Sequence, residues 1–545
     1  MPALFQLLAL LLALGLSSPG GAADTVQVRV LAINDFHGHL QPPKSKEDDG
    51  SSGGAAWLAA HLRAQKAEAA HVVFVSAGDL INASPFVSAL FQDEPTIEVM
   101  NRMGLLVNAV GNHEFDEGVE ELRRMQEGGC HPRLGCQFRP TFEGARFGFL
   151  AANVVSDREG QPLFPAYRIE SFECVKVAFI GLTLQATRSM VHAAGIVGWQ
   201  FRNEAQTVNE LVPALREQGV NAIVLLIHEG GFAGGGPDEC PALSGPLVEI
   251  VRRLDPAVDV VISGHTHQAY NCVLEKRRVT SAGSFGRFLT RLDLTLDKRS
   301  GKIIASDAHN VAITHELTPD PTIAKIVDEA ERAAQTHDRL VGKLQAPIER
   351  SGMVARDLMS GSSGESALGN LVSDAQLWAM REAGAQIAFM NPGGLRADLI
   401  PRPNGTVLFS DLFAAQPFSN NLVAITLTGA QIAELLEQQF PGHRNAQSYP
   451  RVLQVSKGFS YAWSASAPAG HRISEIRLNG KPLDRTASYR VTVNDYLLSG
   501  GDRFAVLREG SDIRAGPIDV NALEAYIAAH SPLAPPTLGR IKRLP

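Results

Sequence analysis

The alternation of apolar runs with polar and amphipathic segments predicts a layered α/β protein. From residue 26 to about residue 310, apolar runs of strand length recur between segments with helical spacing. The expected strands are residues 26–33, 72–75, 107–110, 175–180, 223–227 and 258–262. Leu58 and Leu62 share one face of an expected helix at residues 55–66, and another helix is expected at 208–218. Such alternation is typical of a sheet covered by helices.

The pattern restarts after Leu340, which predicts a second domain. Residues 321–340 are charged, alanine-rich and helix-like, and a small-residue loop at 360–364 precedes an expected helix at 365–382 and a strand at 386–390. Thr428 is expected to cap a helix whose apolar face contains Ile432, Leu435, Leu436 and Phe440. A chain of 545 residues is too long for a single core. We therefore expect a first domain at residues 24–315, a linker helix at 316–345 and a smaller α/β domain at 346–545.

The first 23 residues have the pattern of a signal peptide. An uncharged apolar run at residues 4–16 is followed by small residues, which predicts cleavage just before Asp24. No Lys or Arg precedes the run, which departs from the usual pattern. No later stretch reaches about 18 apolar residues, and the C-terminus lacks a hydrophobic tail. We expect an exported protein, periplasmic or secreted, without a stable membrane anchor.

Five cysteines in an exported chain predict disulfides with one thiol left over. Cys130 and Cys136 lie close enough for a small local bridge, Cys240 and Cys272 are a second plausible pair, and Cys174 is the expected free thiol. The net charge of −7 disfavours a nucleic-acid polymer as partner, whereas a small anion remains compatible with it. The sequence leaves the disulfide pairing and the oligomeric state open.

Residues able to bind a metal follow five of the six strands expected in the first domain. They are Asp35 and His37 after the first strand, Asp79 after the second, Asn112 after the third, His228 after the fifth, and His265 and His267 after the sixth. Ligands of open α/β sheets collect at the carboxyl ends of strands, so these side chains are expected to converge. Two cations about 3.5–4 Å apart can clamp a phosphoryl group and activate a water. Asp79 is the natural bridging ligand, and the donor set favours manganese, zinc, iron or cobalt over a structural zinc.

Each short motif has an ordinary structural explanation when it is taken alone, but the ordered set is specific. Asp35-Phe-His, Gly78-Asp, Gly111-Asn-His-Glu, His228 and Gly264-His-Thr-His together resemble the calcineurin-like metallophosphoesterases. Gly-Asn-His-Glu-Phe-Asp at 111–116 and Asn-Pro-Gly-Gly-Leu-Arg at 391–396 resemble the 5′-nucleotidase family, including its bacterial bifunctional members. This resemblance implies a four-layer β-sandwich flanked by helices, followed by a smaller substrate-binding domain.

The resemblance also implies roles for individual residues of the first domain. One cation is expected on Asp35, His37, Asp79 and His267, and the other on Asp79, Asn112, His228 and His265. Some relatives have Gln at position 267, which leaves the metal preference open. His113 and Asp116 are implied as the catalytic dyad; the ordinary alternative for Asp116 is an acid at a helix N-terminus. Surface roles are expected for His39, His61, His71 and His131.

The second domain is implied to hold the nucleoside. By themselves Phe418 and Tyr496 would more often be core residues, but relatives stack the base between two aromatic rings at the matching positions. The remaining implied contacts are Asp502 with the ribose, Asn420 with the base, and Asn391 and Arg396 with phosphate or ribose. Relatives often have arginines where this chain has residues 360–364, and the nearest preceding arginine here is Arg356. Strict specificity for nucleoside monophosphates is therefore open.

The implied reaction is hydrolysis of 5′-nucleoside monophosphates to nucleoside and phosphate by a metal-bound water, with rotation between the domains. Three alternatives remain. They are a broad phosphoesterase acting on cyclic nucleotides or nucleotide sugars, a relative that cleaves a sulfur-linked ester, and a nucleotide-binding protein without catalysis. The intact His113, Asp116 and metal-ligand set disfavour the last alternative.

Overall fold

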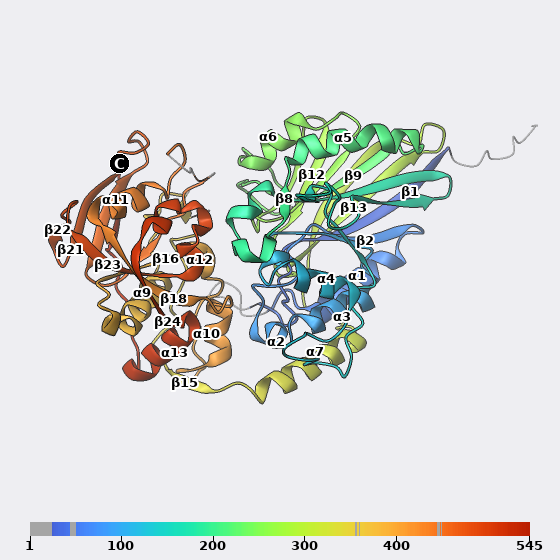
Figure 1. Ribbon diagram of the computed structural model, residues 1–545. Coiled ribbons are helices and arrows are strands. Elements are labelled where there is room, and N and C mark those ends of the chain that lie inside the picture. The colour runs from blue at the N-terminus through green and yellow to red at the C-terminus, as the bar shows by residue number, and fades with distance from the viewer. Residues whose placement is uncertain (1–23, 44–50, 355–356, 359, 444–446, 448) are drawn as a thin grey trace, which may run out of the picture.

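The computed structural model describes residues 24–43, 51–354, 357–358, 360–443, 447 and 449–545. The expected signal peptide and Arg356 lie outside these residues. Two bodies are visible in Figure 1: the N-terminal half, coloured from blue to green, and the C-terminal half, coloured from orange to red. The protein has the predicted mixed α/β architecture, in which two large sheets form the N-terminal half.

Two six-stranded sheets form the centre of the N-terminal half. In spatial order the first contains β14 (Ile303–Ala312), β13 (Phe288–Asp297), β1 (Thr25–Ile33), β2 (Val72–Ser76), β3 (Val107–Ala109) and β4 (Gly148–Leu150). The second contains β11 (Ala269–Leu274), β12 (Arg277–Ala282), β10 (Val260–Ser263), β9 (Ala222–His228), β7 (Val175–Thr183) and β6 (Tyr167–Phe172). β1 to β4 are parallel to one another, and so are β7, β9, β10 and β12.

Helices cover the outer face of each sheet, which gives the four layers that were predicted. The first sheet is covered by α1 (Ala55–Ala67), α3 (Glu94–Met103) and α4 (Val119–Glu127), and α2 (Phe86–Ala89) and α7 (Pro321–Gln335) pack against this helix layer. The second sheet is covered by α5 (Glu204–Glu217) and α6 (Pro246–Arg253). A small pair, β5 (Val154–Ser156) with β8 (Trp199–Phe201), lies beside them. α5 corresponds to the helix expected at 208–218. It begins four residues earlier, at Glu204, because Asn203 is its N-cap.

β9 shows why the strands read as continuous apolar runs. Every residue of this strand is buried. Val224 and Leu226 belong to the core between the two sheets, whereas Leu225 and Ile227 belong to the core under α5 and α6. Because side chains alternate along a strand, a strand buried on both faces loses the polar half of the alternation. His228 is next on the face of Val224 and Leu226, and is thereby directed to the gap between the sheets.

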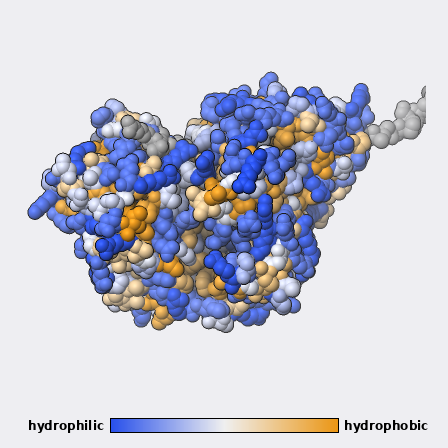
Figure 2. Space-filling model, viewed as in Figure 1, coloured by the Kyte–Doolittle hydropathy of each residue, from blue (hydrophilic) through white to orange (hydrophobic). Residues whose placement is uncertain are grey.

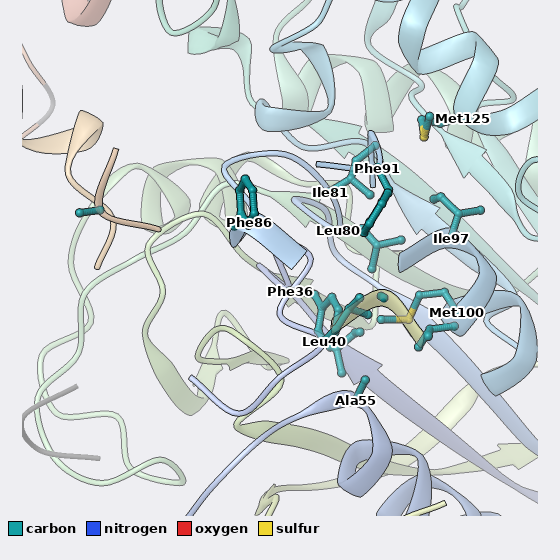
Figure 3. Packing of buried hydrophobic residues seen from close by; sticks show 14 of the residues in the cluster. Phe36, Leu40, Ala55, Leu80, Ile81, Phe86, Phe91, Ile97, Met100 and Met125 are labelled. Atoms are coloured by element: carbon teal, nitrogen blue, oxygen red, sulfur yellow. The ribbon is translucent and has the colours of Figure 1, made fainter. Parts of the chain in front are cut away.

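One cluster of buried hydrophobic residues extends from the helix layer of the first sheet into the C-terminal half. Figure 3 shows part of this cluster, including Phe36, Leu40 and Met100. α7, the helix expected to link the halves, packs against α1, α2 and α3. Phe86 of α2 contacts Phe409 and Phe413 of α10 (Phe409–Ala415), with ring centroids 5.9 Å and 5.7 Å apart. An apolar contact therefore holds the two halves together beside the linking helix.

The C-terminal half is a second α/β unit. Its larger sheet is β19 (Gln454–Val455), β16 (Ile387–Met390), β23 (Ser488–Asn494), β18 (Asn421–Thr428) and β24 (Ser511–Ile518). The smaller sheets are β22 (Lys481–Pro482), β21 (Ile473–Leu478), β20 (Phe459–Ser464) and β25 (Ile541–Leu544), and β15 (Leu340–Lys343) with β17 (Thr406–Leu408). The helices are α9 (Ala367–Ala379), α10, α11 (Gly429–Glu437), α12 (Asp495–Leu498) and α13 (Asp519–His530). Thr428 caps α11 in a capping box with Gln431, as its sequence predicts.

Both plausible cysteine pairs are formed. Cys130 is bonded to Cys136, Cys240 is bonded to Cys272, and Cys174 is an exposed free thiol. No helix among the described residues is long and apolar enough to cross a membrane. The face seen in Figure 2 is mostly hydrophilic, with hydrophobic patches between the polar areas.

Candidate active site

The seven expected metal ligands lie at the carboxyl ends of parallel strands from both sheets. β1, β2 and β3 of the first sheet lead into the loops of Asp35 and His37, of Asp79, and of Asn112. In the second sheet, His228 is the last residue of β9, and β10 leads into the loop of His265 and His267. Asp35, His37, Asp79, Asn112 and His228 are at most 3% exposed. Buried charged and polar groups at this density require partners, because an unpaired buried charge is costly.

The backbone at these ligands is strained. Asp35, His37, Asp79, His265 and His267 all have positive φ angles, between 47° and 69°. Non-glycine residues avoid this region, at a cost on the order of 1–3 kcal/mol each, unless the surroundings impose it. Gly78 also has a positive φ, which a glycine adopts without strain. A side chain could not replace it, because a Cβ there would lie 2.5 Å from Nδ1 of His228. Strain concentrated at five ligand positions is a feature of functional sites.

One group of coordinating atoms is formed by Asp35, His37 and His267. Nε2 of His37 is 3.2 Å from Nε2 of His267, and Nε2 of His267 is 3.2 Å from Oδ1 of Asp35. A second group is Asp79, His228 and His265, in which Oδ2 of Asp79 is 2.9 Å from Nε2 of His228. The same Oδ2 is 3.6 Å from Nε2 of His37. Asp79 therefore belongs to the second group and also lies beside the first.

The hydrogen bonds of the histidines direct their Nε2 atoms into the site. Nδ1 of His37 is 2.9 Å from the carbonyl oxygen of Asn82, and Nδ1 of His228 is 2.8 Å from that of Ala77. A carbonyl only accepts, so each Nδ1 is protonated, and in the neutral imidazole Nε2 is then an unprotonated donor atom for a cation. Such backbone partners are typical of metal-binding histidines.

Oδ1 of Asn112 is a buried atom of the site that has no hydrogen-bond partner among the described residues. Burial lowers the pKa of His228, but the carboxylates of Asp79 and Asp35 outweigh burial and raise this pKa to about 10. A proton on Nε2 offsets the negative charge of these carboxylates, as a divalent cation would. Proton and cation therefore compete for this position. The residues present fit a metal centre.

The expected catalytic dyad is assembled. Nδ1 of His113 is 2.7 Å from Oδ2 of Asp116, and the backbone nitrogen of His113 donates to Oδ1 of Asp79 at 2.9 Å. Burial lowers the pKa of His113, but Asp116 and Asp79 outweigh it, and the net shift is upward. His113 therefore favours the charged imidazolium and has only Nε2 left for a substrate oxygen.

Glu114 holds two metal-site loops together, a role that the sequence did not reveal. Its carboxylate accepts from the backbone nitrogens of Asp79, Leu80 and Gly111 at 2.8–3.0 Å, and from Nδ2 of Asn108 at 3.0 Å. The residue is 1% exposed. These bonds fix the loop after β2 against the loop after β3, and thereby Asp79 against Asn112. The available signal was its place next to His113 in the Gly-Asn-His-Glu motif.

His39 was expected at the surface, and the structure corrects this. Its ring stacks on Phe285 at 3.9 Å between centroids, and its Nδ1 is 3.0 Å from the carbonyl oxygen of His37. Phe285 also packs edge-on against His37 and His267. The apolar ring reaches these histidines from the loop after β12, a position that the sequence pattern could not indicate.

Residues of the C-terminal half reach this centre. Arg396, in the loop after β16, places Nη2 3.2 Å from Nε2 of His37. Burial lowers the pKa of Arg396. The ring of Phe418 stacks on His113, with centroids 5.6 Å apart and 23° between the planes. The two halves therefore form one site.

Three of the other expected nucleoside residues form a hydrogen-bonded network around Asp502. Nδ2 of Asn391 donates to Oδ2 of Asp502 at 3.0 Å, and the hydroxyl of Tyr496 donates to Oδ1 at 3.0 Å. Arg451 forms an ion pair with the same carboxylate. Asp502 was expected to contact ribose; in this structure both of its oxygens are engaged, and it orients Asn391 and Tyr496.

A cavity of about 760 Å³ connects the metal-site loops with this network. Residues lining it include Asp79, Asn112, His113, Asp116, His265 and His267 from the N-terminal half, and Asn391, Arg396, Phe418, Asn420, Tyr496 and Asp502 from the C-terminal half. Tyr449 and Arg451 also line it and were not anticipated. Arg451 directly precedes the apolar run 452–453, and an arginine at the start of a buried segment was the one signal available.

The chain matches known families over most of its length. Residues 28–269 match the calcineurin-like phosphoesterase model, and residues 341–509 match the model of the 5′-nucleotidase C-terminal domain. Cell wall protein Lmo0130 of Listeria monocytogenes is 33% identical over 567 residues, which cover 95% of this chain and 69% of that protein. Endonuclease YhcR of Bacillus subtilis is 31% identical over 95% of this chain, but the chain spans only 41% of that protein.

A solved structure supports the same assignment. The 5′-nucleotidase precursor from Thermus thermophilus has a TM-score of 0.79 and 27% sequence identity, covering 95% of this chain and 99% of that one. The resemblance inferred from the short motifs is thereby confirmed at the level of whole domains. The chain belongs to the 5′-nucleotidase family of calcineurin-like phosphoesterases and is a hydrolase of phosphoric ester bonds.

Proposed function

We propose that this protein hydrolyses 5′-nucleoside monophosphates to nucleoside and phosphate at a centre of two divalent cations. The observation that carries the proposal is the single cavity lined both by the metal-site loops and by Phe418, Tyr496 and Arg396. A phosphoryl group bound near Asp79 would have the C-terminal aromatic and amide side chains within reach of its nucleoside. The family uses divalent metals; the number of ions and the substrate are our proposal.

The first cation would be held by Asp35, His37, Asp79 and His267, and the second by Asp79, Asn112, His228 and His265. When bound, the cations supply Lewis acids for the phosphoryl oxygens and the attacking water. The oxygen, amide and imidazole donors, without thiolate, favour manganese, zinc, cobalt or iron.

The chain's own side chains complete the reaction site. His113, charged and oriented by Asp116, donates from Nε2 to a phosphoryl or leaving-group oxygen as negative charge grows there. Arg396 contributes a fixed positive charge beside His37, 3.2 Å from its Nε2. Phe418 and Tyr496 present aromatic faces suited to a base, and Asn391 presents an amide suited to ribose or phosphate.

We further propose that the protein acts outside the cytoplasm, in the periplasm or as a secreted enzyme. Two disulfides support this, because such bonds persist in oxidising compartments. A relative that is 33% identical carries the name cell wall protein.

The test is phosphate release by the purified protein from AMP, a cyclic nucleotide, a nucleotide sugar and p-nitrophenyl phosphate. We expect AMP to be preferred, chelation to abolish turnover, and manganese, zinc, cobalt or iron to restore it. His113→Ala should keep the metal, measured by elemental analysis, and lower kcat about 10²–10⁴-fold. His131→Ala, in the loop closed by Cys130 and Cys136, is the matched control and should keep full activity.

Other outcomes assign other functions. Equal rates on AMP and p-nitrophenyl phosphate would refute a dedicated nucleotidase. Faster cleavage of the cyclic nucleotide or the nucleotide sugar would favour the broader phosphoesterase. No turnover with any of the metals would favour a nucleotide-binding protein.

A further inference from the structure

Asn420 is held in the cavity wall by a carboxylate that has no role in the reaction described above. The residue lies two positions after Phe418, and both line the cavity. Ser419 between them has a left-handed backbone, with a φ of 51°. The backbone carbonyl of Asn420 accepts from the backbone nitrogen of Asp519 at 2.8 Å. Asn420 is thus fixed to the first residue of α13.

The side-chain amide of Asn420 is oriented by the same residue. Nδ2 of Asn420 donates to Oδ2 of Asp519 at 3.4 Å, and Oδ1 of Asp519 accepts from the backbone nitrogen of Val520 at 2.7 Å. Asp519 is 2% exposed. An ionised carboxylate only accepts hydrogen bonds, so the nitrogen end of the amide must face Asp519. Oδ1 of Asn420 is then the polar atom available to the cavity.

Neighbouring charges do not compete for this contact. Besides burial, the charge of Asp495 in α12 acts on Asp519 and raises its pKa. Its carboxylate accepts from Nδ2 of Asn421 at 3.0 Å and has no hydrogen bond to Asn420 among the described residues. Burial raises the pKa of Asp519 to about 7. At pH 8.5 the carboxylate is therefore ionised and the amide of Asn420 has one orientation.

We propose that Asp519 is a positioning residue that sets the base preference, by holding Asn420 so that it presents an oxygen acceptor to the base. This rests on the proposed nucleotidase function. An acceptor pairs with the exocyclic amino group of adenine or cytosine. It meets the carbonyl oxygen of hypoxanthine or uracil without a hydrogen bond. Leaving a buried polar atom unpaired is enough to discriminate about 5- to 100-fold.

The experiment compares kcat/KM for two substrate pairs at pH 8.5: AMP with IMP, and CMP with UMP. In each pair the bases differ at the edge that an acceptor would recognise, and the sugar phosphate is the same. The wild-type enzyme should prefer AMP and CMP. In Asp519→Asn the new amide can pair with Asn420 in either orientation, so each ratio should fall to within about threefold of one. Turnover of p-nitrophenyl phosphate, which has no base, should be unchanged.

Two further variants separate orientation from general disruption. Asp495→Asn removes the neighbouring carboxylate and should keep the wild-type ratios. Asn420→Ala should lose the preference by itself, and adding Asp519→Asn to it should change the ratios no further. If Asp519→Asn does not fold, Asn420→Ala still reports on the amide.

Opposite results overturn the proposal. They are a wild-type preference for IMP and UMP, unchanged ratios in Asp519→Asn or Asn420→Ala, or further loss in the double variant. Hydrolysis of p-nitrophenyl phosphate but of no nucleotide would instead refute the proposed function, and this inference with it.

Discussion

Substituting Gly111 by alanine should displace the carboxylate of Asp79 without altering that residue itself. A Cβ at this position would meet Oδ1 of Asp79, and would lie 2.5 Å from the backbone nitrogen of Asp79 and 2.8 Å from Oε2 of Glu114. Neither carboxylate can easily withdraw. Asp79 is held through its own backbone nitrogen, and Glu114 by four hydrogen bonds.

The magnitude follows from these contacts. Ordinary van der Waals separation is about 3.5–4.0 Å, so Asp79 and Glu114 would each have to withdraw by roughly 1 Å. Overpacking of a rigid site costs about 1–3 kcal/mol of unfolding free energy. A displacement of about 1 Å at reacting groups lowers turnover about 100-fold. We therefore expect Gly111→Ala to lose both stability and activity, with weaker metal binding.

The assay has a matched control in the same sheet. Gly148→Ala in β4 would place its Cβ 3.9 Å from Val107, an ordinary contact. Urea unfolding with chelator measures stability, calorimetric titration with manganese measures metal affinity, and phosphate release measures kcat. Gly148→Ala should change unfolding free energy by less than about 0.5 kcal/mol. Wild-type metal affinity and kcat in Gly111→Ala would refute the crowding of Asp79 by its neighbours.

Three other predictions test the framework around the site. Glu114→Gln places an amide NH₂ group against backbone N–H donors, and should lower the unfolding free energy, measured with urea at pH 8, by about 1–3 kcal/mol. Glu120→Gln, at an exposed position, is the control and should leave the unfolding free energy unchanged. The Cys240→Ser and Cys272→Ser double variant opens a loop with a sequence separation of 32 and should cost roughly 3–4 kcal/mol in the same assay; no loss would show that the bridge does not constrain the unfolded chain. Burial raises the pKa of Asp259 to about 6. The contribution of this residue to the unfolding free energy is therefore fully present below its usual pKa, where the carboxyl is neutral, and is lost as the pH rises through 6. Asp259→Asn should remove up to about 3 kcal/mol of that decline between pH 4 and 7.5 in thermal or urea unfolding, and an unchanged decline would contradict it.

The sequence by itself determined the strands, and with them the positions of the metal-site loops. β9, and β1 over its last four residues, are apolar because both faces are buried there, so their ends can be read from the point where polar residues resume. Parallel strands bring those ends to one edge, which is why Asp35, Asp79 and His228 could be expected to meet. The Thr428 cap was also local enough to predict, whereas the sequence offered both cysteine pairs as plausible and left the pairing open.

Only the tertiary structure decided how the two halves meet and which polar groups hold the site residues. Arg451 reaches Asp502 from a loop 51 residues away, and Phe418 lies on His113 from the other half of the chain. Asp519 holds Asn420 from 99 residues further along. Periodicity records which side of a strand or helix is buried, and it carries no information about which distant loop will be packed against it. The positions of these loops relative to one another are set by the packing between the sheets and by contacts such as that of Phe86 with Phe409.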